Sequence, residues 1–179
     1  NAVNPRGAYD SYIQEMTKLA QSIFTQGYFP VFIEHVASSE EHESDISAIN
    51  SITTNLKTGE YFVYQNLELN CRQLKALYGE CDFVIGTRFH SVIFALAEGT
   101  PAIAIGYGGN KGRGIMRDLQ MSDCEIAIES FSSERAIEGF MNIMQGNDSK
   151  LKAQNIIAAT RRHHEELARS VRYLHDGIS

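Results

Sequence analysis

The chain has 179 residues, of which 43% are hydrophobic and 21% charged, and its formal net charge is −6. A chain of this size buries about 70% of its unfolded surface on folding, and its composition is ordinary for a globular protein. The negative charge argues against non-specific nucleic-acid binding, which needs a basic surface. No apolar run approaches the roughly 20 residues that span a bilayer, so we expect no transmembrane segment.

The cysteines indicate a reducing compartment. Cys71, Cys81 and Cys124 are odd in number and show no C-x-x-C spacing, which predicts buried free thiols. No signal-peptide pattern opens the chain. We therefore expect a cytoplasmic protein, with a peripheral position at the inner face of the membrane as the alternative.

The first residues suggest an excised domain. Val3-Asn4-Pro5 is typical of the end of a strand, and only Asn1-Ala2 precede it, which we interpret as the remnant of an expression tag. The sequence shows neither internal repeats nor low-complexity linkers. Residues 1–179 are therefore expected to form a single α/β domain.

Helix and strand patterns alternate along the chain. Apolar residues recur at helical spacing from Tyr12 to Phe24, and Gly27 is expected to end that helix. Ser44 is an expected N-cap. The expected strands are 30–33, 61–64, 83–85, 102–105 and 125–128, and the further expected helices run through 46–56, 69–78, 89–98, 115–119, 132–144 and 149–174.

This alternation predicts a Rossmann-like α/β fold, in which a parallel sheet carries helices on both faces. In such sheets ligands bind beyond the carboxyl ends of the strands, near the helix N-termini. The candidate segments at that edge are residues 5–7, 34–35, 86–90 and 107–113.

The strongest of these is Gly86-Thr87-Arg88-Phe89-His90, which places Arg88 and His90 in the first turn of an expected helix. The helix dipole disfavours a cation there by roughly 0.3–1 kcal/mol. A bound anion would reverse that sign, because free N–H groups and Arg88 would converge on it. The alternative is that Arg88 pairs with a nearby carboxylate and that His90 is merely exposed.

The second candidate is the segment from Gly106 to Gly114, with five glycines in nine residues. Glycines let the backbone approach a ligand closely, and Lys111 and Arg113 add positive charge. The segment fits neither a Walker P-loop nor a dinucleotide fingerprint. A flexible surface loop is the alternative.

Three further residues are weaker candidates. Arg6 follows the first expected strand and could reach the ligand crevice at the carboxyl ends of the strands, or remain solvated. His35 ends the second expected strand, which places it at the same edge of the sheet. Asp45 is expected to help cap a helix. His35 and His42 lack metal-ligand spacing, and we expect neither a metal nor another cofactor.

The stretch from Phe83 to Leu119 resembles the signature of polysaccharide pyruvyl transferases: a strand, R-x-H opening a helix, G-x-P, a strand, a tyrosine and a lysine-bearing loop. Val3 to Arg6 resembles that family's strand ending in arginine. Phe32 to Asp45 resembles its strand ending in histidine, with an aspartate downstream. The resemblance covers most of the chain to about residue 120, and the C-terminal third is generic.

The resemblance implies the C-terminal, donor-binding half of a two-domain glycosyltransferase-B type fold, without its N-terminal domain. It also implies phosphoenolpyruvate as donor and a glycan or lipid-linked oligosaccharide of an exopolysaccharide pathway as acceptor. Transfer to a pair of sugar hydroxyls would give a cyclic pyruvate ketal and phosphate. We expect the isolated domain to be inactive.

Carried over by position, Arg6, Arg88 and Lys111 would hold the donor's phosphate and carboxylate, and His90 would act with Arg88 in catalysis. His35 and Arg113 complete the expected substrate-binding set. The extra glycines around Lys111 depart from the family's simpler tyrosine-to-lysine loop, which leaves the role of the lysine open.

Two other functions stay open. A nucleotide-sugar glycosyltransferase shares the fold and the G-x-P turn, but many retaining members carry two upstream glutamates where this chain has Gly86 and Phe94. The other is a non-catalytic module that binds an anion.

Overall fold

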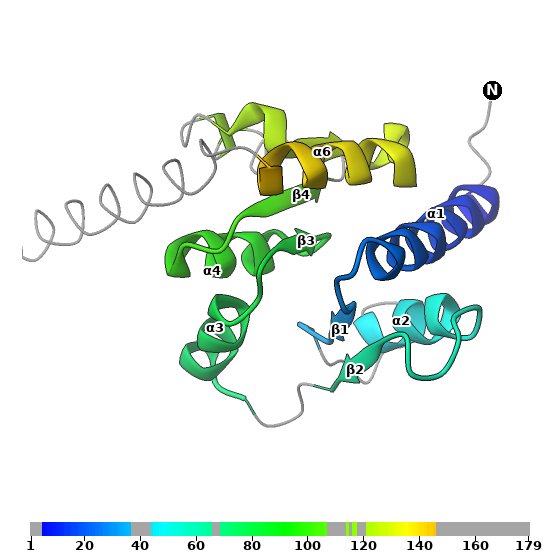
Figure 1. The fold of residues 1–179 in the computed structure, drawn as a ribbon, viewed down its shortest axis with the longest axis horizontal. Coiled ribbons are helices and arrows are strands. Elements are labelled where there is room, and N and C mark those ends of the chain that lie inside the picture. The colour runs from blue at the N-terminus through cyan, green and yellow to red at the C-terminus, as the bar shows by residue number, and fades with distance from the viewer. Residues whose placement is uncertain are drawn as a thin grey trace, which may run out of the picture.

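The computed structural model describes residues 5–36, 44–65, 69–106, 114, 116–117 and 121–145. Helices and strands alternate along the chain (Figure 1). The helices are α1 (Pro5–Thr25), α2 (Asp45–Thr53), α3 (Cys71–Gly79), α4 (Phe89–Glu98) and α6 (Ser133–Gln145), with 3-10 turns η1 (Ser122–Cys124) and η2 (Ile128–Ser130). The strands are β1 (Val31–Ile33), β2 (Phe62–Tyr64), β3 (Val84–Gly86), β4 (Ala102–Gly106) and β5 (Glu125–Ala127).

The described strands form two parallel sheets, whereas the sequence predicted one. β1 pairs with β2, with Val31 opposite Phe62, and the second sheet has the order β3-β4-β5, with Val84 opposite Ala102. A cavity whose lining includes Phe32 of β1 and Ile85 of β3 lies between these two strands. Among the described strands, β1 and β3 form no ladder that would join the two sheets.

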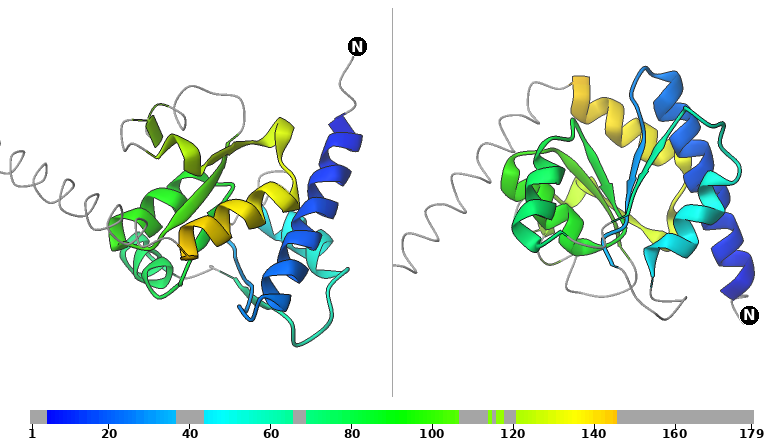
Figure 2. Two further views of the ribbon diagram at one scale, coloured as in Figure 1. Left: turned by 45° about the horizontal axis from the view of Figure 1, so that its top comes forward. Right: turned by 90° about the horizontal axis from the view of Figure 1, so that it is seen from below.

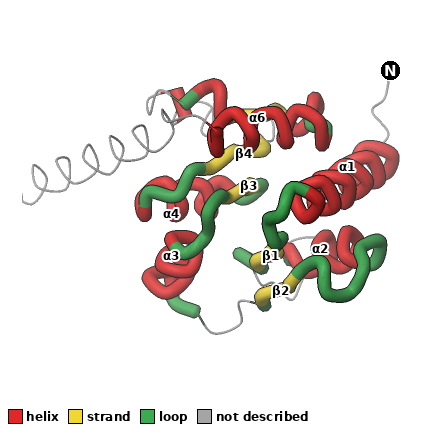
Figure 3. The backbone as a smooth tube through the Cα atoms, viewed as in Figure 1, coloured by secondary structure: helices red, strands yellow, loops and turns green. Residues whose placement is uncertain are grey.

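Helices cover both faces of the larger sheet, which confirms that part of the expected fold (Figures 2 and 3). Alternate residues of β4 enter two different cores, because successive side chains of a strand point to opposite faces. Ala102 and Ala104 pack with residues of α3 and α4. Ile103 packs instead with Leu19 of α1 and Ala136 of α6.

Several helix ends follow the expected capping chemistry. The Ser44 hydroxyl accepts a hydrogen bond from the Ile46 N–H, as an N-cap does. Asn70 and Gln73 form a capping box at the start of α3. Gly99 ends α4 and Gly27 follows α1, both with φ near +90° (88° and 90°), a conformation that glycine adopts without strain.

The start of the chain differs from the prediction. Pro5 and Arg6 were expected at the end of a strand, but both belong to the first turn of α1. Proline suits that turn, because its missing N–H would have no helical partner there. Val3 and Asn4 lie outside the described residues.

Smaller corrections concern element ends and one cysteine. α2 ends at Thr53 rather than Leu56, α3 begins at Cys71 because Asn70 caps it, and Ile128 belongs to η2 rather than to β5. Cys71 is exposed rather than buried, while Cys81 and Cys124 are half-buried. The predicted loop 107–113 and the helix 149–174 lie outside the described residues, as does most of 115–119.

The Glu15 side chain links α1 to the start of α6 through hydrogen bonds. One carboxylate oxygen accepts hydrogen bonds from the Ser133 backbone N–H and hydroxyl, both at 2.8 Å, and the other pairs with Lys18 at 2.7 Å. These bonds lower the pKa of Glu15 to about 2, and the bond with Lys18 has the largest effect. Glu15 thus supplies acceptors to donors that the first turn of a helix leaves unsatisfied.

We expect Glu15→Gln to lower the free energy of unfolding by about 1–2 kcal/mol at pH 7. A carboxylate whose pKa is lowered by folding stabilises the protein above the pKa of the unfolded chain, near 4.3. Its contribution is lost as the pH falls toward 2, so the difference between the proteins should shrink over that window. Urea unfolding at several pH values measures this, with the exposed Glu138→Gln as control. A difference that does not change with pH would contradict the assignment.

Candidate functional site

The segments that follow β1 and β3 and the end of β4 meet at one edge of the molecule. A cavity of about 340 Å³ opens there. His35 follows β1, Arg88 and His90 follow β3, and Gly106 ends β4; all four line the cavity, together with Glu125 of β5. The structure thus brings three of the candidate site residues together at the carboxyl edge of the parallel strands.

Asp45 is the centre of the polar contacts at this edge. Its Oδ2 accepts hydrogen bonds from the backbone N–H groups of His35 and Val36, at 3.1 and 2.9 Å. Its Oδ1 accepts from Nε of Arg88 at 2.8 Å. One carboxylate therefore joins the first residue of α2 to the end of β1 and to the start of α4. The sequence predicted only a capping role, which Ser44 fulfils.

Arg88 and His90 stand at the start of α4 as predicted. Arg88 is the N-cap residue, in extended conformation and without a capping bond from its side chain. Its ion pair with Asp45 and the exposure of His90 also match the alternative interpretation, in which neither residue binds a ligand. These features are compatible with a ligand site, because Asp45 orients a guanidinium that has five N–H donors, and His90 lines the cavity.

His35 makes its side-chain contact with Tyr78. Nδ1 of His35 lies 3.0 Å from the Tyr78 hydroxyl, and Tyr78 is only 3% exposed. The His35 ring also lies 6.4 Å from that of His90, with nearly parallel planes. Burial lowers the pKa of His35, which the Asp45 carboxylate raises in part, and the neighbouring His90 and Arg88 side chains lower this pKa further. Burial likewise raises the pKa of Tyr78.

Gly86 allows α4 to lie directly over the end of β3. A Cβ at this position would touch the Ser91 hydroxyl and would come within 2.6 Å of Cγ2 of Val92. Both contacts belong to the first turn of α4, where the Ser91 hydroxyl donates to the Arg88 carbonyl at 2.6 Å. The absence of a side chain at Gly86 therefore sets how closely Arg88 and His90 approach the strand ends.

A second, larger cavity adjoins the first. It measures about 780 Å³ and lies between the starts of α1 and α2 and the turn η2. Asp45 lines it, and Thr87 and Arg88 line both cavities. Arg88 therefore stands at the boundary of the two cavities and faces both.

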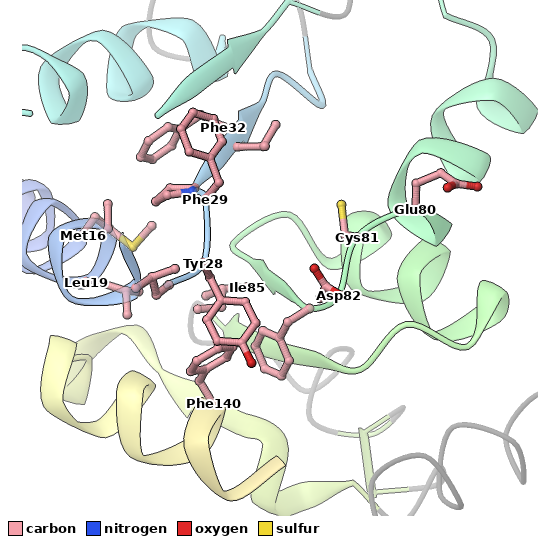
Figure 4. Close-up of a pocket in the computed structure, with 15 residues that line it drawn as sticks. Met16, Leu19, Tyr28, Phe29, Phe32, Glu80, Cys81, Asp82, Ile85 and Phe140 are labelled. Carbon is pink, nitrogen blue, oxygen red and sulfur yellow. The ribbon is translucent and has the colours of Figure 1, made fainter. Parts of the chain in front are cut away.

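A third cavity lies at the opposite ends of the strands and has a different character. It measures about 300 Å³ and is lined largely by apolar side chains, among them Phe29, Phe32 and Phe140 (Figure 4). The charged groups on its lining, Glu80 and Asp82, are acidic. Such a cavity would repel an anion, whereas the anion-binding candidates with described side chains, His35, Arg88 and His90, line the cavity at the carboxyl edge.

Three predicted site residues are not among the described side chains. Lys111 and Arg113 lie outside the described residues, and of Arg6 only the backbone is described. Within the described ranges, no group of three or more His, Cys, Asp or Glu side chains is arranged to hold a metal ion. No helix in the same ranges is long and apolar enough to cross a membrane.

Two residues of the site were missed by sequence reasoning. Asp45 resembles any other acidic residue at a helix start, and only its place after a histidine-ending strand hinted at more. Tyr78 falls on the buried face of α3, where its pattern is that of any core residue. Tyr78 contacts His35 and Asp45 contacts Arg88, and the two residues of each pair are 43 positions apart in the sequence. Contacts at such a separation cannot be recognised from the spacing of residues along the chain.

Comparison with known proteins gives a consistent result. A stretch of 63 residues is 38% identical to the amylovoran biosynthesis protein AmsJ of Erwinia amylovora, and it covers 35% of this chain and 15% of that protein. No solved structure gives a significant match. The family model for polysaccharide pyruvyl transferases matches residues 1–109, which is more than half of the chain. The resemblance noted in the sequence is thereby confirmed: the chain belongs to the polysaccharide pyruvyl transferase family.

Proposed function

We propose that this chain binds phosphoenolpyruvate for transfer of its pyruvyl group to two hydroxyls of a sugar, in a surface polysaccharide or its lipid-linked precursor. The observation that carries the proposal is the arrangement of Arg88, the N-cap of α4, and His90, in its first turn, which line one cavity with His35. Family membership supports the reaction class.

The chemistry asks for groups that hold an anion and move protons. Phosphoenolpyruvate carries a carboxylate and a phosphate, and a guanidinium binds either through paired, charge-assisted hydrogen bonds. Arg88 is held for this by Asp45, and the N-terminus of α4 adds favourable partial charge. In the proposal Arg6, Lys111 and Arg113 complete the cationic set.

The proton balance gives His90 a role. The methylene carbon of the donor gains a proton and becomes a methyl group, while the adjacent carbon forms a bond to the first sugar oxygen. Phosphate then leaves that carbon and the second sugar oxygen takes its place, so each hydroxyl gives up one proton. His90 is exposed, lines the cavity and is positioned to transfer one of these protons, as histidine commonly does in general acid–base catalysis.

We further propose that the 179 residues are the donor-binding domain of a longer, two-domain enzyme of the glycosyltransferase-B type. The matched stretch spans only 15% of the length of AmsJ. A second domain would close over the cavities at the carboxyl edge, exclude water and orient the acceptor hydroxyls, and orientation of this kind lowers reaction barriers by several kcal/mol. This chain alone should therefore release no phosphate.

A nucleotide-sugar glycosyltransferase is the alternative from the same fold class, and the structure gives an argument against its retaining branch. The place of the first glutamate is held by Gly86, where even a Cβ atom would collide with the start of α4. The place of the second is held by Phe94, whose ring lies 5.7 Å from that of His35. Neither position could present a carboxylate without rebuilding the site.

Binding of the donor tests the proposal directly. Titration of this chain with phosphoenolpyruvate, followed by NMR, should shift the amide signals of Gly86, Arg88 and His90. UDP-glucose at the same concentration should leave them unchanged, and the amide of Cys81, on the apolar cavity, serves as internal control. Preferential shifts with UDP-glucose would favour the glycosyltransferase, and no response to millimolar phosphoenolpyruvate would refute the donor site.

A further inference from the structure

Tyr78 is part of the site without touching its open cavity. It belongs to α3 and is 3% exposed, and its hydroxyl lies 3.0 Å from Nδ1 of His35. Its ring also packs near those of His35 and Phe94, with centroids 5.9 and 6.4 Å away. The Tyr78 carbonyl accepts a hydrogen bond from the Thr100 hydroxyl at 3.0 Å, so the residue is fixed at its backbone too.

The direction of the Tyr78–His35 hydrogen bond follows from the chemistry of the two groups. Burial keeps the phenol protonated and the imidazole neutral, because it raises the pKa of Tyr78 and lowers that of His35. A neutral imidazole has one N–H and one acceptor nitrogen. A phenol is a strong donor and a weak acceptor, whereas an unprotonated ring nitrogen is a strong acceptor. The Ser91 hydroxyl also lies within hydrogen-bonding reach of Tyr78, but it donates to the Arg88 carbonyl, and a hydroxyl oxygen is a weaker acceptor than a bare imidazole nitrogen. The Tyr78 hydroxyl therefore donates to Nδ1, and the His35 proton resides on Nε2.

We propose that Tyr78 is a positioning residue that holds His35 as its Nε2–H tautomer, so that a neutral His35 offers a hydrogen-bond donor to the anion bound beside Arg88 and His90. The identity of that anion rests on the proposed function; the tautomer does not. Nδ1 is turned to the buried phenol, which leaves Nε2 as the ring nitrogen available on the side of the cavity that His35 lines.

The surroundings explain why a neutral donor fits at this position. His35 is faced by Asp45 on α2, by Arg88 and His90 on α4 and by Tyr78 on α3, and Glu125 lines the same cavity. The Asp45 carboxylate is already paired with Arg88. A second full positive charge on His35 would be repelled by Arg88, whereas an N–H group binds an anion without adding charge. Donor binding through His35 should therefore not weaken as the pH rises above neutrality.

The tautomer can be measured without any ligand. In this chain labelled with ¹⁵N-histidine, long-range ¹⁵N–¹H correlation spectra distinguish a protonated ring nitrogen from a bare one. We expect Nδ1 of His35 to give the signal of a bare nitrogen at neutral pH, and Tyr78→Phe to give a mixture of tautomers. Tyr28→Phe removes a hydroxyl from a residue on the apolar cavity and is the matched control.

Affinity for phosphoenolpyruvate provides the second measurement. Tyr78→Phe should weaken binding about 3- to 10-fold, the loss expected for one misplaced hydrogen bond. If that variant unfolds, two changes at His35 replace it. His35→Gln should keep part of the affinity, because its amide NH₂ can take the place of Nε2–H, and His35→Asn, whose amide matches Nδ1 instead, should not.

Three results would overturn the inference: a proton on Nδ1 in the unmodified chain, an unchanged tautomer in Tyr78→Phe, or equal affinities of His35→Gln and His35→Asn. If phosphoenolpyruvate fails to bind the unmodified chain, the proposed function fails, and the ¹⁵N spectra still decide the role of Tyr78.

Discussion

Replacing Arg88 with alanine should weaken binding of phosphoenolpyruvate by about 10- to 100-fold, and kcat/KM of the full-length enzyme should fall by a similar factor. The loss corresponds to about 1.5–3 kcal/mol, the usual range for a hydrogen bond to a charged group. The guanidinium is oriented by Asp45 at 2.8 Å and lines the cavity, so its removal takes away both charge and geometry. Calorimetry on this chain and phosphate release by the full-length enzyme measure the two quantities.

Two variants separate this effect from a general loss of charge. Arg88→Lys keeps the charge but cannot make paired hydrogen bonds, so it should recover only part of the affinity. Lys75→Ala removes a lysine that pairs with Glu98 away from the site, and it should bind the donor normally. Donor affinity and turnover equal to the unmodified protein in Arg88→Ala would mean that the anion binds elsewhere.

Replacing Asp45 with alanine should lower the free energy of unfolding by about 2–3 kcal/mol, the largest stability effect that we expect at the site. Its carboxylate accepts two backbone hydrogen bonds and one from Arg88, and the side chain is only 18% exposed. The loss leaves the two N–H groups at the end of β1 without this acceptor and removes the ion pair between Asp45 and Arg88. Urea unfolding of this chain measures the stability.

The same change should also weaken donor binding, because Arg88 would no longer be held in place. Asp45→Asn keeps an oxygen acceptor but loses the charge, so it should fall between alanine and the unmodified chain in both measurements. Asp82→Ala, an exposed carboxylate on the apolar cavity, is the matched control. If Asp45→Ala lost neither stability nor affinity, the carboxylate would have no organising role.

The fold was predictable where local chemistry decides the structure. α4 has the predicted bounds because a glycine that adopts positive φ ends it and a buried strand precedes it. The first turn of α1 was mistaken for a strand, because proline occurs in both settings and three residues carry no period. The split into two sheets could not be foreseen, since strand neighbours depend on side chains that are far apart in sequence.

The site was predictable to the extent that strand ends define it. Arg88, His90 and His35 follow strands directly, so the rule for parallel sheets brought them to one edge. The residues that orient them, Asp45 and Tyr78, come from helices that pack beside those strands. Their roles depend on tertiary distances of about 3 Å that no spacing encodes.

The division into two sheets has a consequence for how the domain responds to a ligand. The described strands leave β1–β2 and β3–β4–β5 without a shared ladder, and α1 spans the gap by packing on both α2 and α6. At the carboxyl edge, the gap is crossed by the Asp45–Arg88 and His35–Tyr78 contacts. A molecule that touches His35 and Arg88 together binds only while the halves are docked, so by mass action it opposes their separation. Occupancy of the cavity would then register as slower amide exchange in β1 and β2, well beyond the residues in contact.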